Sequence, residues 1–153
     1  MNIIFLDVDG VLNSMDSIEQ VTNRRPYSGY DYPFDNKCLS NLKRLVLETN
    51  AFIVLISTWR LERVGRDILF SELRKYRLDT RVIGCTENLN KSREDEIKAY
   101  LEILDENINY IIIDDDMIYP NLEEYLVKTD FRNGLTEEDT DVGIKKLTKK
   151  DKS

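Results

Sequence analysis

The sequence predicts an α/β fold, in which a Rossmann-like parallel sheet carries helices on both faces. Three apolar runs, at residues 3–6, 52–56 and 110–113, contain no charged residue and end at polar residues. Such runs are typical of strands covered on both faces, which occur in parallel sheets. Residues with helical spacing separate the runs and favour right-handed crossovers. We expect one domain over residues 1–153, because this length supports a single core.

The segment between the first two predicted strands divides into a loop and a helix. Residues 14–35 show no hydrophobic period and contain Pro26, Gly29 and Pro33. A loop of this length is usually a lid or a binding loop, so we expect a flap near the functional site. The helix that follows has apolar residues at helical spacing: Leu39, Leu42 and Leu45 or Val46. The second strand, residues 52–56, ends at Ser57.

Helices and strands alternate along the rest of the chain. A third strand is predicted at residues 81–84. A helical turn or two is predicted at residues 121–126, and a short edge strand at residues 127–129. Two further helices are predicted from their N-terminal capping boxes, Ser92 with Asp95 and Thr136 with Asp139. Residues 149–153 are expected to form a flexible tail. Apolar residues define the faces of the two middle helices: Leu61, Val64, Ile68, Leu69 and Leu73 in one, and Ile97, Tyr100, Leu101 and Leu104 in the other.

Acidic residues follow two of the predicted strands. Asp7 and Asp9 come after the first strand, and Asp114, Asp115 and Asp116 end the strand that begins at residue 110. If the first strand is central, these strand ends meet at the topological switch point of the sheet. Each close pair of like charges then costs on the order of 1–4 kcal/mol, which a hard divalent cation relieves. Carboxylate oxygens are the ligands that Mg²⁺ takes, so we expect a Mg²⁺ site there. Asp116 is expected to support the ligands or the turn and not to be a third ligand.

Composition excludes several classes of protein. The chain has no histidine, which excludes Ser-His-Asp triads, Cys-His pairs and His-ligated zinc, so proton transfer must fall to carboxylates. The net charge of −7 argues against a broad nucleic-acid-binding surface. Cys38 and Cys85 have no metal-binding or secreted-disulfide spacing, and the longest apolar run, residues 51–56, is too short to span a membrane. We therefore expect a reduced, cytoplasmic protein with no membrane segment and no obligate protein partner.

The motifs together resemble the haloacid dehalogenase (HAD) superfamily of phosphotransferases. Its four motifs occur in order along the chain, as Asp7 with Asp9, Ser57, Arg93, and Asp114 with Asp115. Three further stretches resemble the HAD domain of Swiss Army Knife RNA repair proteins: STWR at 57–60, REDEI at 93–97 and TDFRNGLTEED at 129–139. No insertion between the motifs is large enough for a full cap domain, so we expect a capless site or one with a small loop cap.

The resemblance implies a role for each motif. Asp7 would attack phosphorus to form an aspartyl phosphate, and Asp9 would protonate the leaving oxygen and then activate water. Asp7, Asp114 and Asp115 would bind Mg²⁺, joined in the family by the backbone carbonyl of Asp9. Ser57 and Arg93 would hold the phosphoryl oxygens. Thr58 remains an alternative to Ser57, and Lys91 an alternative to Arg93.

The implied function is a Mg²⁺-dependent phosphohydrolase that acts on a nucleotide, a polynucleotide end such as a 3′-phosphate, or a small phosphate ester. Arg24 and Arg25 are candidates for substrate recognition, together with Tyr27, Tyr30 and Tyr32 of the same loop. Arg60 is a third candidate, although a salt bridge to a surface acid explains it equally well. Trp59 is interpreted as a packing residue.

Three other functions fit parts of the sequence. Cys38 and Arg44 have the CxxxxxR spacing of cysteine phosphatases, but core-type leucines lie between them where a phosphate-binding loop needs small residues. A phospho-acceptor signalling domain would need an aspartate at the end of the third strand, where Gly84 and Cys85 stand. A catalytically silent, metal-dependent binding module remains the main alternative, because intact motifs do not demonstrate turnover.

Overall fold

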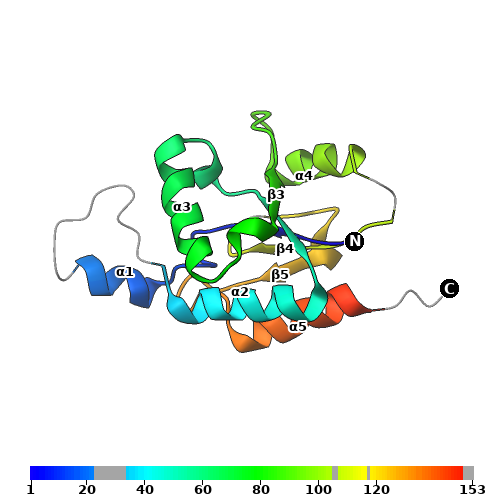
Figure 1. Ribbon diagram of the computed structural model, residues 1–153. Helices are drawn as coiled ribbons and strands as arrows, with labels where there is room; N and C mark the ends of the chain where they lie inside the picture. Colours follow the sequence, from blue (N-terminus) through cyan, green and yellow to red (C-terminus); the bar gives the residue numbers. More distant parts are fainter. Residues whose placement is uncertain (23–33, 105–106, 117, 150–153) are drawn as a thin grey trace.

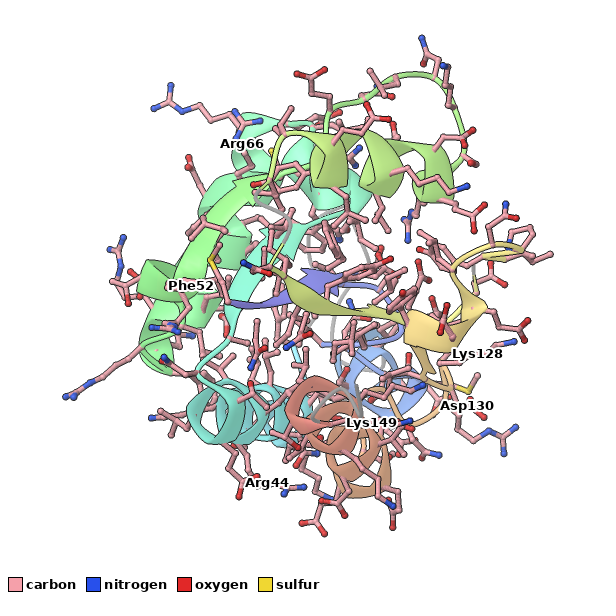
Figure 2. The ribbon with its side chains drawn as sticks, turned by 90° about the vertical axis from the view of Figure 1, so that its right-hand side faces the viewer. Arg44, Phe52, Arg66, Lys128, Asp130 and Lys149 are labelled. Atoms are coloured by element: carbon pink, nitrogen blue, oxygen red, sulfur yellow. The ribbon has the colours of Figure 1, made fainter. Side chains whose placement is uncertain are left out.

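The computed structural model describes residues 1–22, 34–104, 107–116 and 118–149. Its five strands form one sheet in the order β3-β2-β1-β4-β5, and all neighbouring strands are parallel. The strands are β1 Asn2–Leu6, β2 Phe52–Leu55, β3 Val82–Cys85, β4 Asn109–Asp114 and β5 Leu126–Lys128. Figure 2 shows Phe52 towards one edge of the sheet and Lys128 at the opposite edge. The predicted parallel sheet with a central first strand is therefore confirmed.

Helices cover both faces of this sheet. The α-helices are α1 Met15–Thr22, α2 Asn36–Thr49, α3 Arg63–Lys75, α4 Arg93–Glu102 and α5 Glu137–Thr148. The described residues also form three short 3-10 helices, η1 Thr58–Arg60, η2 Asp79–Arg81 and η3 Glu123–Tyr125. In Figure 1, α2 and α5 lie side by side below the sheet and α4 lies above it. Arg44 joins α2 to α5 through a 2.7 Å ion pair with Asp141.

Alternation along the strands creates two apolar layers. Ile4 and Leu6 of β1 face one way and pack with Leu42 of α2, Leu69 of α3 and Leu147 of α5. Ile3 and Phe5 face the other way and pack with Ile97 of α4 and with Tyr119. All four β1 side chains are fully buried, as expected for a central strand of a parallel sheet.

Two local predictions were wrong. Residues 14–35 were predicted to form a loop, but residues 15–22 form α1, whose first turn is held by a hydrogen bond from the Ser17 backbone N–H to the Ser14 hydroxyl. The face predicted for α3 was shifted, because the helix begins only at Arg63 and Leu61 and Val64 are exposed. Its buried face contains Gly65, Leu69 and Leu73, which are spaced four residues apart.

The predicted helix starts before α4 and α5 are confirmed. The Ser92 side chain accepts a hydrogen bond from the Asp95 backbone N–H. Thr136 and Asp139 form the reciprocal capping box at the start of α5. Among the described residues, no helix is both long and apolar enough to span a membrane.

Candidate functional site

The ends of β1 and β4 bring three carboxylates together. Leu6 pairs with Ile113 in the sheet, and the Asp7 backbone N–H donates to the Ile113 carbonyl, so Asp7 lies beside Asp114. Carboxylate oxygens of Asp7, Asp114 and Asp115 all lie within 4.8 Å of one another. Asp7 and Asp114 are buried, at 3% and 1% exposure. This oxygen-only set could hold one hard divalent cation.

Arg93 lies against the same cluster. This residue opens α4, and its Nη1 lies 3.1 Å from Asp7 Oδ1 and 2.8 Å from Asp114 Oδ2. Burial lowers the pKa of the guanidinium, but the two carboxylates outweigh it and raise the pKa above its ordinary value. Arg93 therefore remains a cation, and one positive charge faces three acidic groups.

The three carboxyl groups differ in their tendency to ionise. Burial, followed by the charge of Asp114, raises the pKa of Asp7 well above its ordinary value. Burial and Asp114 also raise the pKa of Asp115. Burial opposes ionisation of Asp114 as well, but the Tyr119 hydroxyl and Arg93 outweigh it and lower its pKa. Asp114 is thus the group most readily charged, and its charge impedes ionisation of the other two.

Hydrogen bonds fix the Asp114 carboxylate in place. The Tyr119 hydroxyl, itself buried, donates to Oδ2 at 2.7 Å, and the Asp116 backbone N–H donates to Oδ1 at 3.2 Å. Asp116 thus supports the Asp114 carboxylate through its backbone. Tyr119 carried no signal in the sequence beyond its aromatic character.

The loop after β1 brings its backbone close to the cluster. Gly10 has a φ of +78°, and a Cβ there would overlap the carboxylate of Asp115. Glycine is therefore required for both conformation and space. The Thr129 hydroxyl donates to the Gly10 carbonyl, and the Leu135 backbone N–H donates to the Val11 carbonyl. The segment after β5 thus holds the first acidic motif.

The side chain of Asp9 is not among the three clustered carboxylates. Its Oδ1 accepts hydrogen bonds from Asn13 Nδ2 at 2.9 Å and from the Trp59 indole N–H at 3.1 Å. The Asp9 carboxylate is therefore not grouped with those of Asp7, Asp114 and Asp115. A Mg²⁺ contact through the backbone carbonyl of Asp9 stays a prediction.

The candidate phosphate ligands lie in different environments. Ser57 is buried at the end of β2, and its hydroxyl accepts a hydrogen bond from the Trp59 backbone N–H. Thr58 is exposed, as is Lys91 in the segment before α4. Arg93 contacts the acid cluster, which favours it over Lys91. The choice between the hydroxyls of Ser57 and Thr58 stays open.

Arg60, a candidate for substrate recognition, lies in a buried network, and its substrate role stays a prediction. Its guanidinium is buried and donates to the carbonyls of Ile56, Ser57 and Thr86 and to the carboxylate of Glu96, which is also buried. Arg60 therefore joins the ends of β2 and β3 to α4. Arg24 and Arg25, with the tyrosines of their loop, lie outside the described residues.

Two buried glutamates hold the first turn of α4. Glu96 pairs with Arg60 and also accepts the Leu89 backbone N–H at 2.8 Å. Glu94 accepts the backbone N–H groups of Asn121 and Leu122 at 2.7 and 2.9 Å. The sequence interpretation missed both residues. Because both glutamates anchor the helical turn that Arg93 opens, they hold the backbone from which that guanidinium extends.

The cysteine-phosphatase alternative has no support from the structure. Cys38 is buried inside α2, and burial raises the pKa of its thiol to about 12. A thiol that remains protonated at neutral pH is not an activated nucleophile. Arg44 pairs with Glu48 and Asp141 instead of with a phosphate loop. Cys85, the other cysteine, is exposed at the end of β3.

Fold and site together define a class, a Rossmann-like α/β domain whose acidic motifs meet at the carboxyl ends of parallel strands. Residues 3–140 match the family described as the HAD domain in Swiss Army Knife RNA repair proteins. The chain belongs to this family, as the motifs predicted. No match was found among curated proteins or among solved structures.

Proposed function

We propose that the protein is a Mg²⁺-dependent phosphohydrolase that acts through an aspartyl-phosphate intermediate. The observation that carries this proposal is that two carboxylates close in sequence, Asp7 and Asp9, lie in different environments. Asp7 lies among the clustered oxygens beside Arg93, whereas Asp9 lies outside the cluster. A nucleophile must be charged and next to a cation, and a general acid must reach the leaving group.

The residues present fit Mg²⁺. Three carboxylates with one arginine leave an excess of negative charge. Burial, followed by the charge of Asp114, raises the pKa values of Asp7 and Asp115, and a bound cation would relieve both effects. Asp7, Asp114 and Asp115 would hold the ion. When bound, Mg²⁺ would neutralise the charge that develops on the phosphoryl oxygens.

The side chains of the protein would carry the reaction in two displacements. An oxygen of Asp7 attacks phosphorus while the bond to the leaving oxygen breaks, and Asp9 gives its proton to that oxygen. Asp9 then takes a proton from water as the water oxygen attacks phosphorus and the bond to Asp7 breaks. Arg93 stabilises the transferring phosphoryl group, and a hydroxyl from Ser57 or Thr58 donates to it.

The surroundings of the site and the family support a proposal for the substrate class. A shallow hollow of about 470 Å³ begins at Asp115 and extends past Lys128 and Phe131. Phe131 is 40% exposed and offers an aromatic face for a base. Because the family description names RNA repair proteins, we propose a phosphorylated nucleotide or a 3′-phosphorylated RNA end.

Phosphate release from a panel of esters tests this function. We expect Mg²⁺-dependent release from 3′-phosphorylated oligonucleotides, nucleoside monophosphates and p-nitrophenyl phosphate, with no release in excess EDTA. The net charge of −7 predicts that long oligonucleotides gain little over mononucleotides. Binding of a 3′-phosphorylated end without any release would identify the silent binding module instead.

Mg²⁺ should also stabilise the folded protein, by about 2.7 kcal/mol at a hundredfold excess over its dissociation constant. The pKa of Asp7 is raised in the folded protein. As the pH rises above about 4, the Asp7 carboxyl group therefore loses its proton in the unfolded chain before it does so in the folded protein. The metal-free protein therefore loses free energy of unfolding through Asp7 over that range. Asp114 has a lowered pKa and acts in the opposite sense. It adds to the free energy of unfolding at neutral pH, and this contribution is lost only as the pH falls below about 4.

We therefore expect the Mg²⁺-induced rise in melting temperature to be larger at pH 7 than at pH 5, because protons compete for the ligands at the lower pH. Asp114→Asn should reduce the rise, and the exposed Asp67→Asn should leave it unchanged. Thermal melts over a Mg²⁺ series measure it. A melting temperature that does not change with Mg²⁺ concentration at either pH would contradict the metal site.

A further inference from the structure

The indole of Trp59 connects two motifs of the site. Its Nε1 donates to Asp9 Oδ1 at 3.1 Å, although 50 residues separate them, and its backbone N–H donates to the Ser57 hydroxyl at 3.2 Å. Trp59 is 4% exposed, and Phe34 meets its ring edge-on with centroids 5.4 Å apart. The ring is therefore held in one orientation, with its N–H group directed at the acid.

A second donor reaches the same oxygen of Asp9. Asn13 Nδ2 donates to Oδ1 at 2.9 Å, and Asn13 Oδ1 accepts the Gly10 backbone N–H at 2.8 Å. Because the Gly10 N–H can only donate, it fixes which end of the Asn13 amide faces Asp9. Two N–H groups thus occupy Oδ1, and within the described part of the chain no hydrogen bond is assigned to Oδ2.

We propose that Trp59 is a positioning residue for proton transfer by Asp9, an inference that rests on the proposed phosphohydrolase function. With Oδ1 held by Trp59 and Asn13, the transferable proton resides on Oδ2. That proton passes to the leaving oxygen as its bond to phosphorus breaks, and Oδ2 later accepts a proton from the attacking water. Trp59 thereby sets the direction from which the proton arrives.

The packing of the site supports this role over a merely space-filling one. If position 59 only had to fill the apolar pocket beside Phe34, phenylalanine would be sufficient and would bring no N–H group that needs a hydrogen-bond partner. An indole N–H that is buried needs a partner, and here its partner is the carboxylate proposed to move the proton. The same three-residue turn, η1, also carries the candidate phosphate-binding hydroxyls at its start.

Trp59→Phe removes the N–H group and keeps an aromatic ring. Its effect on proton transfer can be tested by comparing substrates with different leaving groups. A 3′-phosphorylated nucleoside needs its leaving oxygen protonated, whereas p-nitrophenolate leaves without help. We expect kcat on the nucleoside phosphate to fall about 10- to 100-fold, a part of the roughly 10²- to 10⁴-fold supplied by general acid–base catalysis. On p-nitrophenyl phosphate kcat should fall about threefold or less, with KM little changed on either substrate.

Phe34→Leu is the matched control, because it loosens the packing of the indole and leaves the N–H group in place. Its losses should be equal on the two substrates. Benzothienylalanine at position 59, in which sulfur replaces the N–H group, keeps the shape of tryptophan and serves if Trp59→Phe folds poorly. The Mg²⁺-induced rise in melting temperature should match wild type in all variants, since the clustered carboxylates are intact.

Equal losses of kcat on both substrates in Trp59→Phe and in the benzothienylalanine variant would overturn the positioning role and leave Trp59 as packing. Unchanged kcat on both would also overturn it. In either case wild-type turnover would still support the phosphohydrolase itself. A wild-type protein that releases no phosphate from any ester would instead overturn the proposed function, and the positioning role with it.

Discussion

Asp7→Asn should abolish phosphate release, with kcat lower by a factor on the order of 10⁴ or more, as for other lost nucleophiles. The amide is a poor nucleophile and cannot form a stable phosphoryl intermediate. Rapid acid quench with a ³²P-labelled substrate should trap labelled protein in wild type and none in the variant. The fold should survive, because the substitution removes one of three crowded carboxyl groups, and melting temperature checks this.

Asp9→Asn is the natural comparison for that result. It should slow turnover most on substrates with poor leaving groups, because the phosphoryl transfer to Asp7 then proceeds without a general acid. Labelled protein should still be trapped with p-nitrophenyl phosphate. If Asp7→Asn retained most of its activity on that ester, the aspartyl-phosphate mechanism would be wrong.

Arg60→Ala should lower the free energy of unfolding by about 3–5 kcal/mol, because it leaves Glu96 buried without its cationic partner. Three backbone carbonyls also lose their donor. Urea unfolding measures the change. Arg63→Ala is the matched control, since its pair with Asp67 is highly exposed and contributes about 0–1 kcal/mol.

The same pair of variants separates a structural from a substrate-binding role of Arg60. A destabilised Arg60→Ala protein that retains the wild-type KM at low temperature would agree with the buried network. A variant as stable as wild type with a raised KM for phosphate esters would support the substrate role predicted from sequence.

The hydrophobic pattern was sufficient to predict the sheet and to predict that the acidic residues at the ends of two strands lie close together. Asp7 and Asp114 follow apolar runs that only a central parallel strand pair accommodates, so their proximity follows from topology. The short helix α1 was missed because its eight residues lie in a segment with three turn-forming residues. Its available signal was Ser14 followed by Ser17, which hydrogen-bond at the first turn.

The contacts that complete the site could not be predicted from local patterns. Trp59 meets Asp9 across 50 residues, and Arg60 meets Glu96 across 36. Residue type alone does not distinguish a packing tryptophan from one whose N–H group reaches an acid, nor a surface arginine from a buried one. Those distinctions depend on side-chain direction, which tertiary packing decides.

The hydrogen bonds from Thr129 and Leu135 to the loop after β1 have a consequence for folding during synthesis. The ribosome makes the first acidic motif before the other three, yet 119 residues separate Gly10 from the threonine that supports it. Central strand β1 also waits for β4, whose residues begin at Asn109. Contacts this distant in sequence form late, because the intervening chain must first be ordered. The first motif to be made is therefore among the last to acquire its active geometry, and a ribosome-bound chain that ends before Leu135 should be inactive.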